Sequence, residues 1–460
     1  MQRLAKIMVT MGPSTLDYAV VRRMMAAGAD GFRINLSHGD EKQWATFLDL
    51  IDKASQELGV HVARVADLEG PRVRLGEFQG VDVAPGQQVK FKYKDAQGDG
   101  VPVDSRAFFS AIERGDRVLV DDGKVVLEVD DVERDSATLR VLSGQRLEPR
   151  KGVVLAGKEY DLPPVTEKDL NDMKFIASKN FDYVMASFVR SSRHVEVIKR
   201  ALADAGVKDA KILAKIETPS GVNNIDSILD VVDGVVVARG DLGMHFPLED
   251  IPMIQRRIIE AARRKLKPVI LATEIFMSMI ERPLPTRGEI SDVYAGIEEG
   301  VDGFLVTSET SIGRYPVEVV SWLSRVIEEA NKNVRPRRVD QALTTLDMRV
   351  SKGVVEMAQS VGASVVAYAS DFDAARLLAA FRPGAQIYVG VPSEQLARRL
   401  SILWGVVPIV VGDSVDEVHG LEVTEAELVK RGIMGPGSLV VELSWTPDRT
   451  TAVVKVRQIF

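Results

Sequence analysis

Eight short runs of β-branched and other apolar residues constrain the fold of this chain more than any other feature. Most of them end in polar residues, and helical periodicity fills most of the intervals between them. Near-continuous apolar runs of this length are typical of parallel strands buried on both faces. In chain order the runs are KIMVT (6–10), GFRINLS (31–37), VARVADLE (62–69), DYVMASF (182–188), KILAKIE (211–217), GVVVARGD (234–241), PVILATE (268–274) and GFLVTSE (303–309). Eight strand–helix units predict an α/β protein built on a (β/α)8 barrel.

The barrel pattern is interrupted after the third run and ends well before the last residue. In the interruption, alternating segments such as QQVKFKY and KVVLEVDDV are divided by Gly- and Asp-rich turns, which predicts an inserted small β-barrel-like domain. After the eighth unit, strand-like and helical segments alternate again and predict an open, mostly parallel α/β domain. The expected divisions are the first part of the barrel at 1–70, the inserted β domain at 71–155, the second part of the barrel at 156–336 and the C-terminal domain at 337–460.

Composition excludes several classes of function. The net charge of -7 and the pI near 5.5 argue against a general affinity for nucleic acid or anionic membranes. The chain has no cysteine, which removes disulfides, thiolate metal sites and Cys nucleophiles. No apolar run approaches the ~18–20 residues needed to span a bilayer. The N-terminal segment MQRLAKIMVTMGPST lacks the apolar core of a signal peptide, so we expect a cytoplasmic protein.

Polar residues follow most of the predicted barrel strands, where the loops of such a barrel converge above its axis. One such residue often does no more than cap a helix or pair with a neighbour. A whole set is harder to explain in that way, because charges crowded at a barrel mouth must be paired or engage a ligand or metal. The set comprises Arg33, Asn35, Ser37, Asp67, Lys215, Glu217, Arg239, Asp241, Thr273, Glu274, Thr307 and Glu309.

The residue types in this set favour phosphoryl chemistry. There is no Ser-His-Asp arrangement and no HExxH metal motif. Glu217 and Asp241 follow adjacent strands, and two carboxylates with room for waters and substrate oxygens suit Mg²⁺ or Mn²⁺. Arg33, Arg74 and Lys215 supply positive charge for a phosphoryl group, whose transfer needs positioning and charge neutralisation.

One tempting motif fails. Residues 152–158, GVVLAGK, match the GxxxxGK part of a phosphate-binding loop. The next residue is Glu159 where Ser or Thr should bind Mg²⁺, and the interior of the segment is apolar. We interpret it as a chance match.

A series of motifs in this chain resembles the ordered motif series of pyruvate kinases. They run in family order from residue 6 to about 316, and the C-terminal region has the family's place and pattern. VARGDLG together with LATEIFMSM and PTRGE is close to diagnostic. The others include KIMVTMGPST, RINLSHG, GPRVRLG, VDDG, RKGVVLAG, DLPPVTEKD, ASFVR, LAKIET, EISDV and SETSIGRYP.

The resemblance implies transfer of a phosphoryl group from phosphoenolpyruvate to ADP, the last step of glycolysis, with Mg²⁺ or Mn²⁺ as cofactor. Glu217 and Asp241 match the family's divalent-metal ligands, and Lys215 matches the lysine that stabilises the phosphoryl group and the enolate. Thr273 matches the threonine that contacts the substrate carboxylate and helps arrange proton delivery to the enolate. The implied catalytic residues are Lys215, Thr273 and Arg33, and the implied substrate-binding residues are Arg33, Lys215, Ala238, Arg239, Gly240, Asp241, Thr273 and Thr307.

On the nucleotide side, the resemblance implies roles for Pro13, Asn35, His38, Arg74 and Lys151. The inserted domain would act as a lid that excludes water from the reacting group. The resemblance also implies a homotetramer with allosteric regulation, whereas no nucleic acid or membrane is expected as a partner.

The monovalent-cation site of many family members is altered here. Asn35, Ser37 and Asp67 are present, but Leu68 stands where Thr is usual, followed by Glu69 where Lys is usual. The position that often holds Glu in K⁺-dependent members is Arg72. A guanidinium could supply the charge that K⁺ provides elsewhere, so K⁺ is not expected to be required.

Two other regions depart from the family pattern. The turn that binds the phosphate of sugar bisphosphates is replaced by residues 370–373, SDFD, whose two carboxylates would repel phosphate. Activation by fructose 1,6-bisphosphate is therefore not expected. On the nucleotide side, Thr307 and Ser308 stand where Ser and Gly are usual, Ile312 replaces a Lys, and Gln43 stands where an aromatic is often found.

Two rival interpretations make different demands on the sequence. A carbon–carbon or carbon–phosphorus acting enzyme on a related barrel would share the metal carboxylates but would need neither the lid nor Lys151 and Arg74. A catalytically silent metabolite sensor should have lost Lys215 or a metal carboxylate, and this chain retains them.

Overall fold

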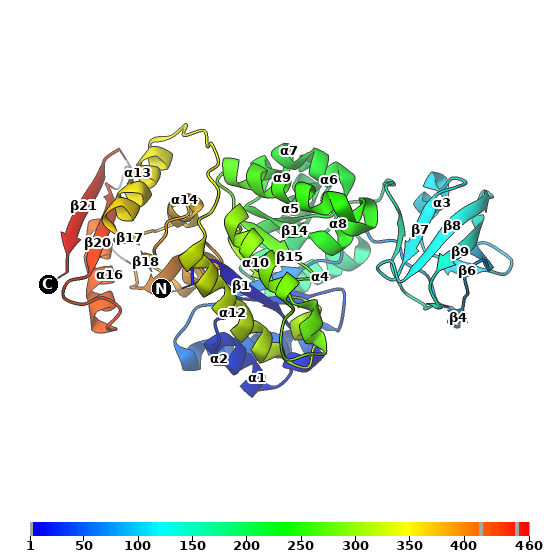
Figure 1. The fold of residues 1–460 in the computed structure, drawn as a ribbon, viewed down its shortest axis with the longest axis horizontal. Helices are drawn as coiled ribbons and strands as arrows, with labels where there is room; N and C mark the ends of the chain where they lie inside the picture. Colours follow the sequence, from blue (N-terminus) through cyan, green and yellow to red (C-terminus); the bar gives the residue numbers. More distant parts are fainter. Residues whose placement is uncertain (1–2, 414–416, 447–449, 460) are drawn as a thin grey trace.

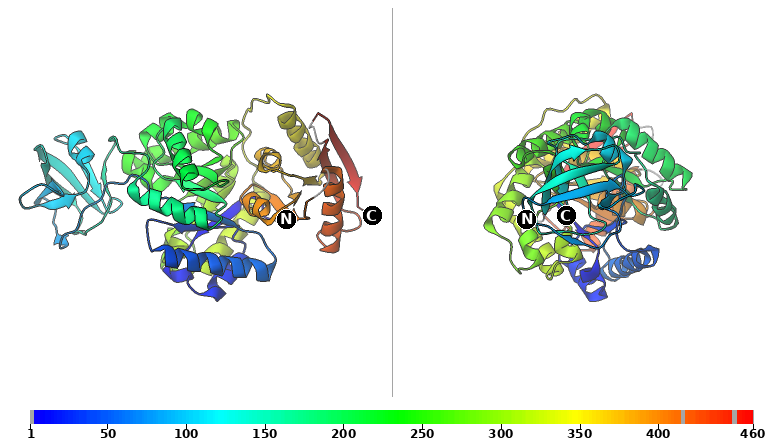
Figure 2. Two further views of the ribbon diagram at one scale, coloured as in Figure 1. Left: turned by 180° about the vertical axis from the view of Figure 1, so that it is seen from behind. Right: turned by 90° about the vertical axis from the view of Figure 1, so that its right-hand side faces the viewer.

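The computed structural model describes residues 3–413, 417–446 and 450–459. Figure 1 shows three parts in a row, with the barrel between the inserted domain at one end and the C-terminal domain at the other. The view from behind in Figure 2 shows the same order, with the inserted domain standing clear of the rest. None of the described helices is both long and apolar enough to cross a membrane.

The predicted barrel is present as a closed ring of eight parallel strands in the order β1-β16-β15-β14-β13-β12-β3-β2. All eight predicted runs contain one strand each, and their side chains are almost entirely buried, as parallel strands covered by helices require. The strands are β1 (Lys6–Thr10), β2 (Gly31–Asn35), β3 (Ala63–Asp67), β12 (Tyr183–Ala186), β13 (Lys211–Ile216), β14 (Gly234–Ala238), β15 (Val269–Ala272) and β16 (Gly303–Leu305).

The helices around the ring begin and end at residues with recognisable capping chemistry. Thr166 and Thr286 each form a capping box, and Gly59 and Gly300 end their helices in the left-handed conformation. The helices are α1 (Tyr18–Ala26), α2 (Glu41–Leu58), α4 (Glu167–Ser178), α5 (Ser192–Asp204), α6 (Pro219–Asn223), α7 (Ile225–Val231), α8 (Arg239–His245), α9 (Ile251–Arg264), α10 (Arg287–Glu299), α11 (Ser308–Ser311) and α12 (Pro316–Asn333), with short 3-10 turns η1 (Pro13–Thr15), η2 (Leu248–Asp250) and η3 (Met277–Ile280).

A repeated aspartate holds the amino-terminal ends of neighbouring strands together. Every second strand of the ring is directly preceded by an aspartate. These residues are Asp30, Asp182, Asp233 and Asp302. In each case the aspartate N–H donates to the carbonyl of a residue in the neighbouring barrel strand that precedes it in the chain. The N–H of that same residue donates back to the aspartate carboxylate. These reciprocal pairs fix the register of the strands on the face opposite to the strand ends that carry the predicted site.

The C-terminal domain closes this face of the barrel with buried cations. Arg382 pairs with Asp302 at 2.5 Å and Arg398 pairs with Asp182 at 3.0 Å. One continuous hydrophobic core runs through the barrel and into the C-terminal domain. These two parts therefore behave as one packed body.

The C-terminal domain is the predicted open α/β unit. Its sheet has the order β19-β18-β17-β20-β21, and only the last strand is antiparallel to its neighbour. The elements are α13 (Leu346–Val361), β17 (Ser364–Tyr368), α14 (Phe372–Ala380), β18 (Ile387–Val391), α15 (Glu394–Leu400), β19 (Val406–Val410), α16 (Glu417–Lys430), β20 (Leu439–Trp445) and β21 (Ala452–Gln458).

The inserted domain has its own hydrophobic core, separate from that of the barrel. A six-stranded sheet of order β11-β7-β8-β9-β5-β6 is accompanied by a two-stranded ladder of β4 and β10 and by one helix. The elements are β4 (Val81–Asp82), β5 (Gln88–Tyr93), β6 (Val101–Val103), α3 (Arg106–Ala111), β7 (Arg117–Val120), β8 (Val125–Val132), β9 (Ser136–Ser143), β10 (Arg146–Leu147) and β11 (Val153–Leu155). A domain with its own core and two connecting segments is suited to move as a unit.

We predict that Asp302→Asn destabilises the protein strongly, by about 3–5 kcal/mol, because it leaves the buried guanidinium of Arg382 without its counter-charge. Asp233→Asn is the matched control, since Asp233 occupies the same position in the repeat but pairs with Lys211 at 3.3 Å near the surface. Thermal unfolding should show a clearly lower midpoint for Asp302→Asn than for Asp233→Asn. Equal midpoints for the two variants would contradict the importance of the buried pair.

Candidate active site

A cleft of about 580 Å³ opens at the carboxyl ends of the barrel strands. Most of the residues singled out from the sequence line it, whereas Lys151, Arg239, Gly240, Glu274 and Glu309 are not part of its lining. The predicted residues that do line it are Pro13, Arg33, Asn35, Ser37, His38, Asp67, Leu68, Arg74, Lys215, Glu217, Ala238, Asp241, Thr273 and Thr307. Strands far apart in the sequence thus bring fourteen predicted residues to one cavity.

A buried cluster of opposite charges forms the floor of the cleft. The carboxylate of Asp67, which is 1% exposed, lies 2.6 Å from the guanidinium of Arg33 and 3.8 Å from Lys215 Nζ. Arg33 also donates a hydrogen bond to the hydroxyl of Thr10 at 3.1 Å. Pairing is what allows such charges to be buried at all.

Three oxygens surround the ammonium group of Lys215, one each from Glu217, Ser187 and Asp67. Its Nζ lies 2.8 Å from Glu217 Oε1 and donates to the hydroxyl of Ser187 at 3.0 Å. Burial lowers the pKa of Lys215, but the charges of Asp67, Glu217 and Asp241 outweigh it, so the pKa is raised. The ammonium is therefore charged at neutral pH and available to an anionic group.

Glu217 and Asp241 form the candidate divalent-metal site. Glu217 is fully buried, and its Oε2 accepts a hydrogen bond from the N–H of Phe188 at 2.6 Å. Its Oε1 faces the Lys215 ammonium at 2.8 Å, so a divalent cation bound here would share this oxygen with Lys215. Burial raises the pKa of Glu217, opposed by Lys215 and reinforced by Asp241. A cation bound beside Glu217 would reduce the free-energy cost of burying its charged carboxylate.

The donor set is sparse, as Mg²⁺ sites often are. Among the described residues no group of three or more His, Cys, Asp or Glu is arranged to hold a metal. Two carboxylates that leave several positions to water and substrate oxygens fit Mg²⁺, which gives up its waters reluctantly.

The start of α8 meets the hydroxyl of Thr273 beside this site. Gly240 N–H donates to Thr273 Oγ1 at 2.8 Å, and that hydroxyl donates to the carbonyl of Ala272 at 2.6 Å. The side chain of Arg239 reaches the carbonyls of Thr273 and Glu274. Arg239 therefore contributes its backbone to this segment, while its guanidinium supports the neighbouring loop.

The inserted domain reaches the cleft through charged pairs. Arg72 lies 2.6 Å from Asp122 in the inserted domain and 4.0 Å from Asp241 in the barrel, so one guanidinium touches both parts. Lys151 pairs with Asp121 at 3.0 Å, on the inserted domain itself. Arg72 lines the cleft, whereas Lys151 lies outside its lining.

Arg74, predicted to contact phosphate, is held by the unusual Glu69. The guanidinium donates to one oxygen of Glu69 at 2.6 and 2.8 Å and to the carbonyl of Arg150 at 3.0 Å. Nearby, burial and then the charge of Arg74 lower the pKa of His38, whose imidazole is therefore neutral at pH 7. A neutral ring does not add to the positive charge offered to a nucleotide.

The segment 152–158, rejected above as a phosphate loop, lies in the inserted domain as part of a β-strand. Residues Val153–Leu155 form β11 and pair with β7, and Lys158 bonds to Glu113 and Asp116. The strand pairing rules out the loop-to-helix geometry that cradles phosphate.

Sequence reasoning missed Ser187 and Phe188, which lie at the end of the fourth barrel strand. Ser187 accepts from Lys215 and donates to the carbonyl of Leu68 at 2.8 Å, so it links the catalytic candidate to the monovalent-site position. The signal was available, because the run DYVMASF ends in Ser187 as the other runs end in polar residues.

A closed barrel with a charged cleft at the strand ends is the architecture of a (β/α)8-barrel enzyme. Comparison with known proteins is more specific. The pyruvate kinase barrel domain matches residues 2–320, and the pyruvate kinase alpha/beta domain matches residues 348–457.

Relatives of the same name cover nearly the whole chain. Pyruvate kinase from Aeropyrum pernix is 42% identical over 99% of this chain and 98% of its own length. Pyruvate kinase from Pyrobaculum aerophilum is 34% identical over 94% of this chain and 95% of its own. A crystal structure of the Pyrobaculum aerophilum enzyme superposes with a TM-score of 0.89 at 33% identity, covering 99% of both chains. The chain belongs to the pyruvate kinase family, phosphotransferases that use phosphoenolpyruvate and ADP.

We predict that Ser187→Ala lowers kcat about 10- to 150-fold, because loss of one hydrogen bond to a charged group is worth about 1.5–3 kcal/mol. The thermal unfolding midpoint should change little. Ser110→Ala, which removes a hydroxyl bonded to a helix carbonyl in the inserted domain, is the control and should keep wild-type kinetics. An unchanged kcat in Ser187→Ala would show that Lys215 does not need this contact.

Proposed function

We propose that this chain catalyses Mg²⁺-dependent phosphoryl transfer from phosphoenolpyruvate to ADP, yielding pyruvate and ATP, without a requirement for K⁺ and without activation by fructose 1,6-bisphosphate. The observation that carries the proposal is the convergence of Lys215, Glu217, Asp241 and Arg33 on one cleft. Cations for a phosphoryl group and carboxylates for a divalent metal are the parts that this reaction needs.

Each group has a role that its contacts support. Glu217 and Asp241 would hold the divalent cation, which would supply positive charge to the transferring group. Lys215, charged and fixed by Ser187, lies within reach of the same oxygens and stabilises the transferring group. Arg33 would fix the phosphate end of the substrate, and the backbone of residues 238–240 would bind the substrate carboxylate, which requires Gly240 N–H to exchange its bond to Thr273 Oγ1 for one to the carboxylate. Thr273 helps arrange the proton that the enolate receives.

The inserted domain acts in this proposal as a lid over the cleft. Its separate core and the Arg72 bridge to Asp122 support closure as a rigid unit. Closure would bring Lys151 and Arg74 to the nucleotide phosphates and exclude water, which would otherwise hydrolyse the phosphoryl donor. Pro13, Asn35 and His38 complete the nucleotide side of the cleft.

Lys215→Met tests the catalytic assignment. We expect phosphoryl transfer to fall below detection in a coupled assay of pyruvate formation, because the charge that stabilises the transferring group is lost. Binding of phosphoenolpyruvate and Mn²⁺, measured by calorimetry, should remain. Lys211→Met is the matched control, since Lys211 lies on the same strand but at the opposite end of the barrel, paired with Asp233. A Lys215→Met variant that retains substantial turnover would contradict the role.

Independence of K⁺ is supported by the charges around the former monovalent position. Asp67, the only carboxylate among Asn35, Ser37, Asp67 and Leu68, is already neutralised by Arg33 and Lys215. Arg72 adds a fixed positive charge near Asp241 and is attracted by Glu217 as well. In this proposal, protein cations supply the positive charge near Asp67 and Asp241 that a bound K⁺ would otherwise supply.

Reversing the charge at Arg72 should create a cation requirement. We predict that Arg72→Glu makes turnover depend on added K⁺, while Arg72→Lys stays active in K⁺-free buffer because it keeps the positive charge. Steady-state rates in tetramethylammonium buffer with and without KCl make the comparison. Loss of wild-type activity in K⁺-free buffer would refute the proposal.

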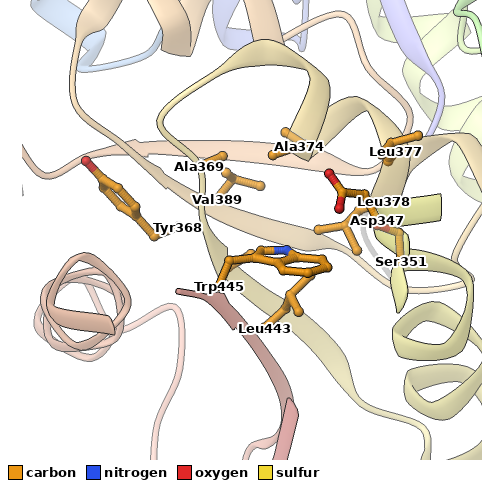
Figure 3. A pocket seen from close by; sticks show the side chains of 12 residues that line it. Asp347, Ser351, Tyr368, Ala369, Ala374, Leu377, Leu378, Val389, Leu443 and Trp445 are labelled. Carbon is orange, nitrogen blue, oxygen red and sulfur yellow. The ribbon is translucent and has the colours of Figure 1, made fainter. Parts of the chain in front are cut away.

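The region expected to bind effectors offers little room for a sugar bisphosphate. Figure 3 shows the cavity beside α14, lined by Ala369, Ala374, Trp445 and Asp347 among others. Its volume is about 10 Å³, roughly that of one water molecule. Asp371 caps α14, and Asp373 pairs with Arg376 at 2.7 Å, so the turn presents carboxylates where a phosphate would need donors. Tetrameric assembly, allosteric regulation and a cytoplasmic location stay predictions.

A further inference from the structure

The loop that follows β15 contains two consecutive residues in the left-handed backbone region. Thr273 has φ 67° and Glu274 has φ 54°. A β-branched residue such as threonine rarely adopts this conformation, which is strained and persists only when the surroundings enforce it. Contacts from outside the turn must therefore hold it in this conformation, because its own residues do not favour it.

One support comes from the neighbouring strand end. Glu309 is fully buried, and its Oε1 accepts hydrogen bonds from the N–H groups of Ile275 at 3.2 Å and Phe276 at 3.1 Å. Its Oε2 accepts from the N–H of Thr307 at 2.7 Å and from the Thr307 hydroxyl at 3.3 Å. One carboxylate therefore ties the loop after β15 to the loop after β16.

A second support acts on the carbonyl side of the same turn. Arg239 Nη2 donates to the carbonyls of Thr273 at 2.7 Å and Glu274 at 3.0 Å. Its Nη1 is held by Asp292 of α10 at 2.6 Å. An anion thus holds the N–H groups just after the strained pair, and a cation holds the carbonyls of the pair itself.

The strained turn determines where the Thr273 hydroxyl lies. That hydroxyl is 2.8 Å from Gly240 N and 2.6 Å from Ala272 O, beside the metal-ligand candidate Asp241. A relaxed turn with negative φ would swing the side chain out of this position. The hydroxyl's location is therefore a consequence of the supports on either side.

Glu309 is a buried carboxylate whose four donors come from two different loops. Glu309 has no Lys, Arg or His partner within ion-pair distance among the described residues. Burying an unpaired carboxylate is costly, and four donors to one group recover part of that cost. Groups whose burial costs free energy are expected beside a catalytic cleft, where a fixed geometry is needed.

We propose that Glu309 is a positioning residue which, together with Arg239 and Asp292, clamps the Thr273–Glu274 turn and so fixes the Thr273 hydroxyl for proton delivery to the enolate. The inference rests on the proposed function, in which Thr273 has that role. Glu309 acts on the proton step through Thr273 and does not itself touch the substrate.

The test separates the proton step from phosphoryl transfer. Exchange of the pyruvate methyl protons with D₂O, in the presence of Mg²⁺ and inorganic phosphate, follows the proton step alone by NMR. Glu309→Gln keeps the shape but has only one accepting oxygen. We expect methyl exchange to fall about 10- to 100-fold, the effect of a misplacement near 1 Å. Because Glu309 also bonds to Thr307 on the nucleotide side, the KM for ADP is measured alongside and should change less than the exchange rate.

A double-mutant cycle identifies the route of the effect. In a Thr273→Ala background, Glu309→Gln should cause no further loss of exchange, because the hydroxyl that it positions is already absent. Glu299→Gln is the control, since this buried carboxylate accepts from Gln255 on the outer helices and should leave exchange at the wild-type rate. Additive losses in the double mutant, or wild-type exchange in folded Glu309→Gln, would overturn the inference.

Two further measurements keep the outcomes distinct. If Glu309→Gln does not fold, Asp292→Asn replaces it, because Asp292 is partly exposed and only orients Arg239. A folded Asp292→Asn variant should show the same selective loss of exchange to a smaller extent, and wild-type exchange would overturn the clamp. A wild-type protein that forms no pyruvate from phosphoenolpyruvate and ADP would instead overturn the proposed function itself.

Discussion

Closure of eight parallel strands into one ring is the constraint on which the rest of this structure depends. Because all strands run in the same direction, every strand end opens at one mouth, and every strand start lies on the opposite face. The reciprocal bonds of the four repeated aspartates fix the starts of neighbouring strands in register. The C-terminal domain then covers that face with Arg382 and Arg398. The cleft with the candidate active site lies at the opposite end of the barrel, at its mouth.

Charge crowding at the mouth explains the pairing pattern of the cleft. Each of five cations in and around the cleft has an acidic partner, so their charges are balanced by the protein itself. The pairs are Arg33–Asp67, Arg72–Asp122, Arg74–Glu69, Lys151–Asp121 and Lys215–Glu217. Binding of an anionic substrate with a divalent cation would exchange these partners without exposing a lone buried charge. Glu69 and Arg72, which depart from the family pattern, change this balance on the nucleotide side and near the metal carboxylates.

Much of this could be predicted from the sequence, because barrel strands and their polar ends follow a short-range pattern. All eight strands, the inserted domain and many residues of the cleft, though not Ser187 and Phe188, were identified from runs and motifs. Side-chain direction is not visible in this way. The motif around Arg239 implies that its backbone holds the substrate carboxylate, but it gives no sign that the guanidinium bonds to the carbonyls of Thr273 and Glu274. Glu309 was recognisable as a strand-end residue, but its bonds to another loop depend on the closure of the ring.

The measurement that tests the central claim most directly is a ³¹P NMR time course of the wild-type protein with phosphoenolpyruvate, ADP and Mg²⁺ in K⁺-free buffer. The account predicts that the phosphoenolpyruvate signal decays while the γ-phosphate signal of ATP grows in equal measure. Release of inorganic phosphate in place of ATP, or no conversion at all, would contradict it.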